Sequence, residues 1–132
     1  MERLLGQYSP YLDAVMRIVV GFLFACHGAQ KLFGVLGGFG PSGGTAPLFS
    51  LMGLAGVIEV FGGLCIMLGW LTGSVAFIAS GEMAVAYFTM HAKESFWPIL
   101  NKGELAVVYC FLFLYIACRG GGSYSVGRGR SA

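Results

Sequence analysis

Charged side chains are scarce in this chain of 132 residues, because Asp, Glu, Lys and Arg together make up only 11% of it. Soluble domains carry about 25% charged residues, and a small domain needs a large polar surface because its surface-to-volume ratio is high. Hydrophobic residues make up 57% of the chain, and the mean hydropathy is +0.78. The shortage of charge argues against a water-soluble domain and predicts an integral membrane protein.

Several sequence motifs are also missing. The four cysteines, Cys26, Cys65, Cys110 and Cys118, form no C-x-x-C pair, so we expect them to pack as small apolar groups. The glycine-rich stretch 34–44 follows no strand and lacks the Lys and Ser/Thr of a phosphate-binding loop. No zinc motif is present, and the net charge of +2 is too small and scattered for a nucleic-acid partner. We therefore predict no metal site and no nucleic-acid binding.

Four segments are apolar and long enough to approach the roughly 20 residues of a spanning helix: about 11–33, 48–70, 71–91 and 103–118. They must be helical, because an isolated strand would leave backbone groups unpaired in hydrocarbon. The link between the second and third segments is so short that these two helices should form an antiparallel hairpin. The sequence therefore predicts an all-α fold, a bundle of four transmembrane helices.

This pattern divides the chain into three parts: an interfacial segment at 1–10, the transmembrane domain at 11–118 and a flexible Gly/Arg tail at 119–132. Arg17 interrupts the first apolar run, which argues against a cleaved signal peptide. An even number of spans places both termini on one side. Four arginines lie on that side against three lysines on the other, which favours cytoplasmic termini.

Small residues recur at helical spacing within the apolar segments. Gly56, Glu59 and Gly63 share one face of the second segment, while Gly21 and Gly28 lie on one face of the first. Apolar contact does not drive helix association in lipid, so small residues mark the places where two helices approach closely. We expect these positions to form helix contacts.

Ionisable side chains within the apolar segments are the clearest functional signal. A charge at the bilayer centre costs at least about 2.5–3.5 kcal/mol on insertion scales, and such residues usually face the bundle interior. Each segment nevertheless contributes one or more. They are Arg17, His27 and Lys31 in the first, Glu59 in the second, Glu82 and His91 in the third, and Glu104 near the start of the fourth.

Their depths follow from a rise of about 1.5 Å per residue, counted from the side of the termini. Glu59 and Glu82 lie about 15–17 Å deep, near the midplane, and Arg17 is within reach of them. We therefore expect a polar interior lined by Arg17, His27, Glu59, Glu82 and Glu104. The three glutamates outnumber the one buried arginine, so one or more of them would lack a positive partner. An unpaired carboxyl group in a low-dielectric medium favours its protonated form.

Two other interpretations of these residues remain open. The charges can form a buried ion-pair network that only fixes the register of the helices. His27 and His91, on two different helices, can also serve as axial ligands of a haem iron, although His91 is equally suited to face water at a helix end. We regard haem as the less favoured cofactor.

Four strings in this order resemble the DoxX family, together covering about residues 11–126. They are RIVVGFLFACHGAQKLFG at 17–34, GEMAVAYF at 81–88, FWPILNKGELA at 96–106 and GGGSYS at 120–125. The resemblance implies a small four-helix protein of the bacterial inner membrane. It also implies that Arg17, His27, Lys31, Glu59, Glu82 and Glu104 occupy the recurrent polar positions of the family.

The resemblance also suggests a function. The family is named after relatives described as the membrane subunit of a quinone-linked thiosulfate oxidoreductase, and other members are linked to oxidative stress. This implies a redox-associated subunit, itself not necessarily an enzyme, that binds a quinone or similar lipophilic molecule. Partner proteins or further copies of the chain would complete the complex. A small transporter or channel that relays protons or a solute is an alternative, and a structural assembly subunit without chemistry is another.

Overall fold

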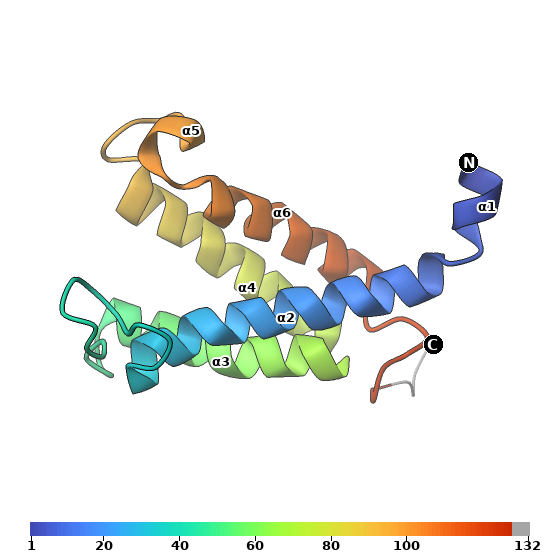
Figure 1. The fold of residues 1–132 in the computed structure, drawn as a ribbon, viewed down its shortest axis with the longest axis horizontal. Coiled ribbons are helices and arrows are strands. Elements are labelled where there is room, and N and C mark those ends of the chain that lie inside the picture. Colours follow the sequence, from blue (N-terminus) through green and yellow to red (C-terminus); the bar gives the residue numbers. More distant parts are fainter. Residues whose placement is uncertain (128–132) are drawn as a thin grey trace.

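The computed structural model describes residues 1–127. Within this range the chain is helical, apart from turns and an isolated β-bridge between Phe39 and Gly44. The helices, drawn in Figure 1, are α1 (Glu2–Gly6), α2 (Ser9–Phe33), α3 (Leu51–Leu68), α4 (Thr72–Ala86), the π-helical turn η1 (Tyr87–His91), α5 (Pro98–Asn101) and α6 (Glu104–Arg119). The predicted all-α fold is confirmed for the described residues.

Three helices are long and apolar enough to cross a membrane: α2, α3 and the continuous unit of α4 with η1 (Thr72–His91). The fourth long helix, α6, has 16 residues, which span about 24 Å at 1.5 Å per residue. That is shorter than the roughly 30 Å hydrocarbon core of a bilayer. The structure therefore supports three of the four predicted crossings by length and composition.

Glycine and serine define the ends of the helices. Gly34 follows the last residue of α2 and Gly69 follows that of α3, and both cap their helices in the left-handed conformation (φ 65° and 76°), which glycine adopts without steric cost. α3 begins after Ser50, whose side chain accepts a hydrogen bond from the backbone N–H of Gly53. Only Gly69, Trp70 and Leu71 separate α3 from α4, which explains the tight hairpin between them.

The long helices pack as two pairs, α2 with α3 and α4 with α6. The pairs lie close together at the end that carries both termini and diverge toward the end that carries α5 (Figure 1). Glycines bring α2 and α3 together: a Cβ built on Gly21 would lie 2.6 Å from the carbonyl oxygen of Gly63, and one on Gly28 would lie 2.6 Å from that of Gly56. These are the glycines expected to form helix contacts.

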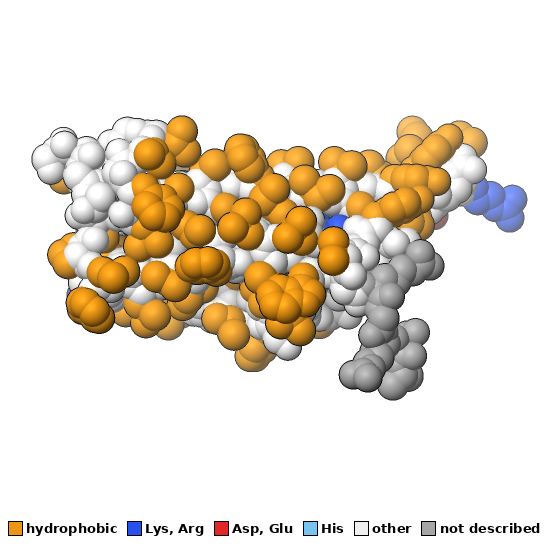
Figure 2. Space-filling view, turned by 90° about the horizontal axis from the view of Figure 1, so that it is seen from below, with side chains coloured by type: hydrophobic (Ala, Val, Ile, Leu, Met, Phe, Trp, Pro, Cys, Tyr) orange, Lys and Arg blue, Asp and Glu red, His pale blue; other side chains and the backbone are white. Residues whose placement is uncertain are grey.

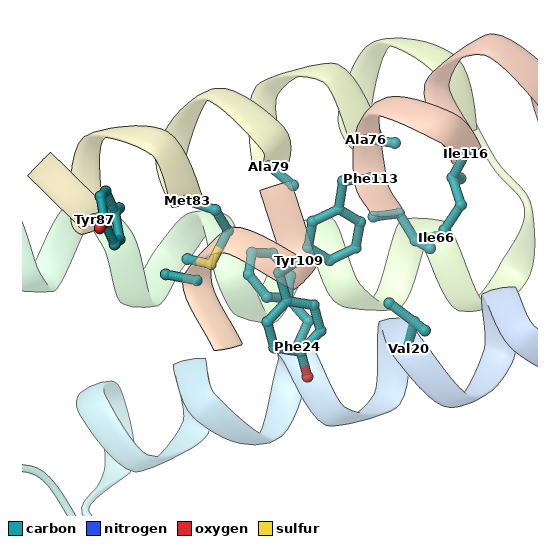
Figure 3. Close-up of a cluster of buried hydrophobic side chains, with 11 residues drawn as sticks. Val20, Phe24, Ile66, Ala76, Ala79, Met83, Tyr87, Tyr109, Phe113 and Ile116 are labelled. Carbon is teal, nitrogen blue, oxygen red and sulfur yellow. The ribbon is translucent and has the colours of Figure 1, made fainter. Parts of the chain in front are cut away.

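An apolar core fills the centre of the bundle, where the two pairs meet. Phe24, Ile66 and Phe113 are at most 1% exposed, and the Phe24 and Phe113 rings contact edge to face with centroids 4.6 Å apart (Figure 3). The outer surface is apolar too, and hydrophobic side chains cover much of the face drawn in Figure 2. Phe61 and Phe111, for example, are 63% and 67% exposed. Such a surface is suited to contact with lipid.

Part of the predicted flexible tail is held against the bundle. The backbone N–H of Val126 donates to the carbonyl of Leu68 (2.9 Å), and that of Gly127 donates to Gly69 (3.3 Å). The chain after α6 therefore folds back over the α3–α4 turn. Residues 128–132, the rest of that predicted tail, lie outside the described residues.

Candidate functional site

A buried ion pair joins α2 to α3. The Nζ of Lys31, in the last turn of α2, lies 2.5 Å from Oε1 of Glu59 in the middle of α3. The Glu59 side chain is 2% exposed and that of Lys31 is 19% exposed. The close glycine contact of the helices explains the pair, because Gly56 lies against the Cβ of Lys31. Side chains on a helix lean toward its N-terminus, so Lys31 reaches back toward the middle of the bundle, where Glu59 lies.

A second carboxyl group, that of Glu82 on α4, lies beside this pair. It interacts with Glu59, and the charge of Lys31 acts on both carboxyl groups. His27, one turn before Lys31 on α2, also acts electrostatically on Glu59. One oxygen of each carboxyl group, Oε2 in both, is buried and meets no donor group among residues 1–127, and the two carboxyl groups lie within hydrogen-bonding reach of each other. The cluster therefore places two carboxyl groups around one lysine, and they can share a hydrogen bond when one of them is protonated.

A cavity of about 510 Å³ reaches this cluster from the end of the molecule opposite the termini. It lies between the two diverging helix pairs. Its polar lining residues are His27, Lys31, Glu82, His91, Glu94, Asn101, Lys102 and Tyr109. Its apolar lining residues are Met52, Ala55, Met83, Ala86, Met90, Leu105 and Ala106. The cavity is therefore amphiphilic. Glu82 on α4 is partly buried, whereas Glu94 and Lys102 are exposed at the edge of the cavity.

The rest of the bundle closes this cavity on the side of the termini. The apolar core of Phe24, Phe113 and Ile66 separates the Glu59–Glu82 level from Arg17, and Figure 3 shows its aromatic rings packed between α2 and α6. Tyr109 belongs to both features, because it lines the cavity and stacks on Phe113 with centroids 5.4 Å apart. The described structure therefore offers a pocket that opens on one side, and not a continuous path across the bundle.

Both histidines line the cavity. His91 has its Nδ1 3.0 Å from the carbonyl oxygen of Asn101, and its ring stacks on that of Tyr87. No group of three or more His, Cys, Asp or Glu side chains within residues 1–127 is placed to hold a metal ion. The shared cavity is compatible with the two-histidine haem hypothesis, which stays a prediction.

Arg17, which we expected beside the glutamates, is not part of this cluster. Its guanidinium donates to the carbonyl oxygens of Ile66 (2.6 Å), Met67 (2.5 Å) and Tyr124 (2.5 Å). Helix geometry explains the difference, because the side chain leans toward the N-terminus of α2 and so away from the midplane. There it meets the carbonyl groups of the last turn of α3, where the negative end of the helix dipole attracts a cation.

Glu104 is also outside the cluster. It is exposed in the first turn of α6 and does not line the cavity. A carboxylate near a helix N-terminus interacts favourably with the helix dipole, which accounts for an acidic residue there. Of the six predicted site residues, the structure therefore brings together His27, Lys31, Glu59 and Glu82.

Sequence reasoning missed two residues of the site, Asn101 and Tyr109. Asn101 is 2% exposed, and its side chain donates to Ser95 O (2.7 Å) and accepts from the backbone N–H of Gly103 (2.8 Å). It thereby fixes the loop that forms one edge of the cavity. Tyr109 shares the buried face of α6 with Ala106, Phe113 and Ile116, and their 3,4,3 spacing was the available signal.

Arg17→Met is expected to loosen the end of the bundle that carries the termini. The change removes the guanidinium from three carbonyl groups, of which Ile66 O keeps the Gly69 N–H as a donor (3.2 Å), and should lower the free energy of unfolding by about 1–3 kcal/mol. It should also expose the segment 120–127 to protease. Thermal unfolding and limited proteolysis of the purified full chain would measure both effects. Arg119→Met is the matched control, because the exposed Arg119–Asp13 pair should contribute at most about 1 kcal/mol. Equal behaviour of the two variants would contradict the role given to Arg17.

Comparison with known proteins agrees with this architecture. The sequence model of the DoxX family matches residues 12–92, which contain α2 from Leu12 onward, α3, α4 and η1, with the whole Lys31–Glu59–Glu82 cluster. A protein of Haemophilus influenzae described as an uncharacterized protein is 42% identical over 126 residues, which cover 90% of each chain. No solved structure matches the chain. The chain therefore belongs to the DoxX family of membrane proteins.

Proposed function

We propose that this protein is a membrane subunit of a redox system that binds a quinone, or a similar small lipophilic molecule, in the amphiphilic cavity. One observation carries the proposal: a buried Lys31–Glu59 ion pair lies beside Glu82, which lines the cavity. Ionisable groups within the bilayer are costly, and their usual roles are ligand binding and proton transfer.

The charge balance of the cluster supports proton exchange. The positive charge of Lys31 balances the negative charge of one carboxylate. The cluster of Lys31, Glu59 and Glu82 is therefore neutral only when one of its two carboxyl groups is protonated. A quinone takes up two electrons and two protons when it is reduced to a quinol. A partner protein would supply the electrons, and the cluster would pass on the two protons one after the other, regaining a proton each time from water at the open end of the cavity.

The surroundings of the cavity suit a ligand that enters from lipid. A second, almost wholly apolar pocket of about 440 Å³ lies between α4, η1 and α6, and it shares Met83 and Ala106 with the polar cavity. Phe88, Trp97 and Phe111 line this pocket and are more than 60% exposed. A molecule with a polar ring and an apolar tail would place the ring beside Glu82 and the tail in this groove.

The same proposal includes the placement of the protein. We propose that α6, which packs along α4, makes the fourth crossing despite its length, as hydrophobic mismatch is tolerated at modest cost. The location is then the bacterial inner membrane with cytoplasmic termini, and the partners are redox proteins or further copies of the chain. Electrons would arrive from such a partner.

A small transporter is the second candidate, and the charged edge of the cavity favours it. Glu94 and Lys102 are exposed there and would attract a polar solute or a proton from water. Passage across the membrane requires that the apolar core of Phe24 and Phe113 opens. Proton flux into liposomes that contain the full chain would distinguish this function, since a binding subunit produces none.

Glu82→Gln is the variant that tests the proposal. In lipid nanodiscs, a short-tailed quinone analogue should bind the wild-type chain, and its affinity should vary with pH because the cluster holds an exchangeable proton. Glu82→Gln removes the acid but keeps the shape, so we expect about tenfold weaker binding and no such pH dependence. Glu104→Gln, an exposed carboxylate outside the cavity, is the matched control and should behave as wild type. Unchanged affinity and pH dependence in Glu82→Gln would refute the proposal.

A further inference from the structure

The π-helical turn η1 continues α4 toward the open end of the cavity. The backbone N–H of Ala92 donates to the carbonyl oxygen of Tyr87 (2.9 Å), a step of five residues where an α-helix takes four. The turn therefore holds one residue more than a turn of α-helix. Single π-turns of this kind are rare and occur frequently at functional sites.

The extra residue changes the direction in which His91 points. His91 follows Glu82 by nine residues, about two and a half turns, so in an uninterrupted α-helix it would lie on the side opposite Glu82. One extra residue in the turn rotates it back by roughly 100°, the step of one residue in an α-helix. His91 accordingly lines the cavity together with Glu82, Met83, Ala86 and Met90. The π-turn thus adds a histidine to the face that carries Glu82.

A hydrogen bond determines which ring nitrogen of His91 carries the hydrogen. Nδ1 lies 3.0 Å from the backbone carbonyl oxygen of Asn101. A carbonyl oxygen only accepts, so Nδ1 is the donor, and in the neutral ring Nε2 is then an acceptor. Asn101 is itself held in place, because its buried side chain donates to the hydroxyl of Tyr87 (3.2 Å) and to the carbonyl of Ser95 (2.7 Å). The fold therefore sets the tautomer of His91.

The acceptor nitrogen of His91 is open to the cavity. Among residues 1–127, Nε2 has no hydrogen-bond partner, and it is not one of the fully buried atoms. One face of the ring stacks on Tyr87, and Nδ1 points at Asn101, so the free edge of the ring is the one that carries Nε2. The cavity lined by His91 therefore presents a free acceptor of fixed identity on the same side of the helix as Glu82.

We propose that Nε2 of His91 accepts a hydrogen bond from a hydroxyl group of the bound molecule, so that the cavity prefers a quinol to the corresponding quinone. This inference rests on the proposed function and names the redox form that the same site selects. A quinol carries hydroxyl hydrogens, whereas a quinone has carbonyl oxygens alone and cannot donate to Nε2. Because Nε2 is accessible and water can replace the hydroxyl, we expect a preference of about tenfold.

Such a preference would assist the electron transfer. Tighter binding of the reduced form makes the bound quinone easier to reduce, and a tenfold difference corresponds to about 30 mV for a two-electron couple. A quinone in the cavity would then accept electrons from a partner protein more readily than a quinone free in lipid. His91 would contribute this effect through binding, while the Lys31–Glu59–Glu82 cluster supplies the protons.

The ratio of two affinities measures the preference. Calorimetry of the full chain in lipid nanodiscs, without oxygen and in mildly alkaline buffer, would compare tetramethyl-p-benzoquinone with its quinol. Partition into lipid is the same for all variants, so the change of the ratio between variants is the measure. His91→Asn keeps a donor at the place of Nδ1 but lacks the acceptor at Nε2, and the preference for quinol should fall about tenfold. His91→Gln keeps an acceptor near the place of Nε2 and should retain most of the preference.

The controls separate binding from loosening of the turn. His91→Phe keeps a ring against Tyr87 but has no acceptor, so it should lose the preference as His91→Asn does. Thr89→Val is the matched control, because Thr89 lies in the same π-turn, bonds to the carbonyl of Val85 (2.7 Å) and does not line the cavity. A loosened turn alone would weaken both forms alike and leave the ratio unchanged.

The outcomes distinguish this inference from the proposed function. If neither form binds, or if both bind Glu82→Gln as tightly as wild type, the proposed function fails and the inference fails with it. If binding depends on Glu82 but the ratio is the same in wild type, His91→Asn and His91→Phe, the inference alone is overturned. A ratio that falls in these two His91 variants and is kept in His91→Gln and Thr89→Val would support it.

Discussion

Lys31→Met is expected to destabilise the bundle more than removal of the charge at Arg17, Glu59 or Lys102. The change leaves Glu59, whose side chain is 2% exposed, without its cation in the middle of the helix bundle. Breaking a buried ion pair by removing one partner costs about 3–5 kcal/mol, because the remaining charge stays desolvated. Unfolding of the purified full chain by heat, or by increasing amounts of a denaturing detergent, would measure the loss.

The effect should depend on which partner is removed. Glu59→Gln leaves Lys31, which is 19% exposed and lines the cavity, so its amine can turn toward water and the loss should be smaller. The double variant Lys31→Met with Glu59→Gln should recover part of the stability that Lys31→Met loses. Lys102→Met, an exposed lysine at the edge of the same cavity, is the matched control and should change stability little. Equal stability of Lys31→Met and Lys102→Met would contradict the burial of the pair.

Gly28→Ala is expected to have the second large effect, because it forces α2 away from α3. The new Cβ would lie 2.6 Å from both the carbonyl oxygen of Gly56 and the backbone nitrogen of Val60. Backbone atoms cannot turn aside as a flexible side chain does, so the helices must separate. We expect a loss of about 1–3 kcal/mol, typical of overpacking, and a displaced Lys31–Glu59 pair. Thermal unfolding would measure the loss, and the quinone-analogue titration would detect the displacement.

Gly81→Ala is the control for helix propensity. Gly81 is exposed in the middle of α4, and a Cβ there would meet no atom within 4 Å. Alanine is the better helix former by about 0.5–1 kcal/mol, so this variant should be as stable as wild type or more stable. If Gly28→Ala were equally harmless, the close contact of α2 and α3 would not exist as described.

The sequence predicted four membrane helices, of which three are long and apolar enough to span, and it named His27, Lys31, Glu59 and Glu82, which the structure brings together. It did not predict the partner of each residue. Arg17 and Lys31 lie on the same face of α2, Arg17 in its N-terminal half and Lys31 in its last turn. Depth counted along the helix axis places each side chain level with its own backbone atoms. On that basis Arg17 was expected beside the glutamates. Both side chains lean toward the N-terminus of α2, and this direction takes Lys31 toward Glu59 but Arg17 toward the end of α3. Depth alone could not distinguish these outcomes.

Glu104 shows a different limit. It was expected to line the polar interior, but the position of a side chain on a helix surface depends on how that helix is rotated. Ala106, Tyr109, Phe113 and Ile116 fix the rotation of α6, and Glu104 falls outside the face that they bury. The same apolar spacing is visible in the sequence. It predicts which face of α6 is inward once the packing of α6 on α4 is known.

The segment after α6 could not be assigned from composition. Glycine and serine favour a flexible chain, and nothing local in 120–127 indicates a docking site. Its hydrogen bonds go to the α3–α4 turn and to Arg17, which lie far away in the sequence. Such contacts depend on the completed bundle and therefore do not appear in any short window of residues.

The retention of a small molecule by the cavity is the central claim, and native mass spectrometry tests it most directly. The full chain would be released from membrane particles that keep their lipids, and bound molecules would be identified by mass. We predict that wild-type protein and Glu104→Gln each retain one quinone-class or similarly lipophilic molecule, and that Glu82→Gln loses it. Wild-type protein that carries phospholipid alone, or a ligand retained equally by Glu82→Gln, would contradict the account.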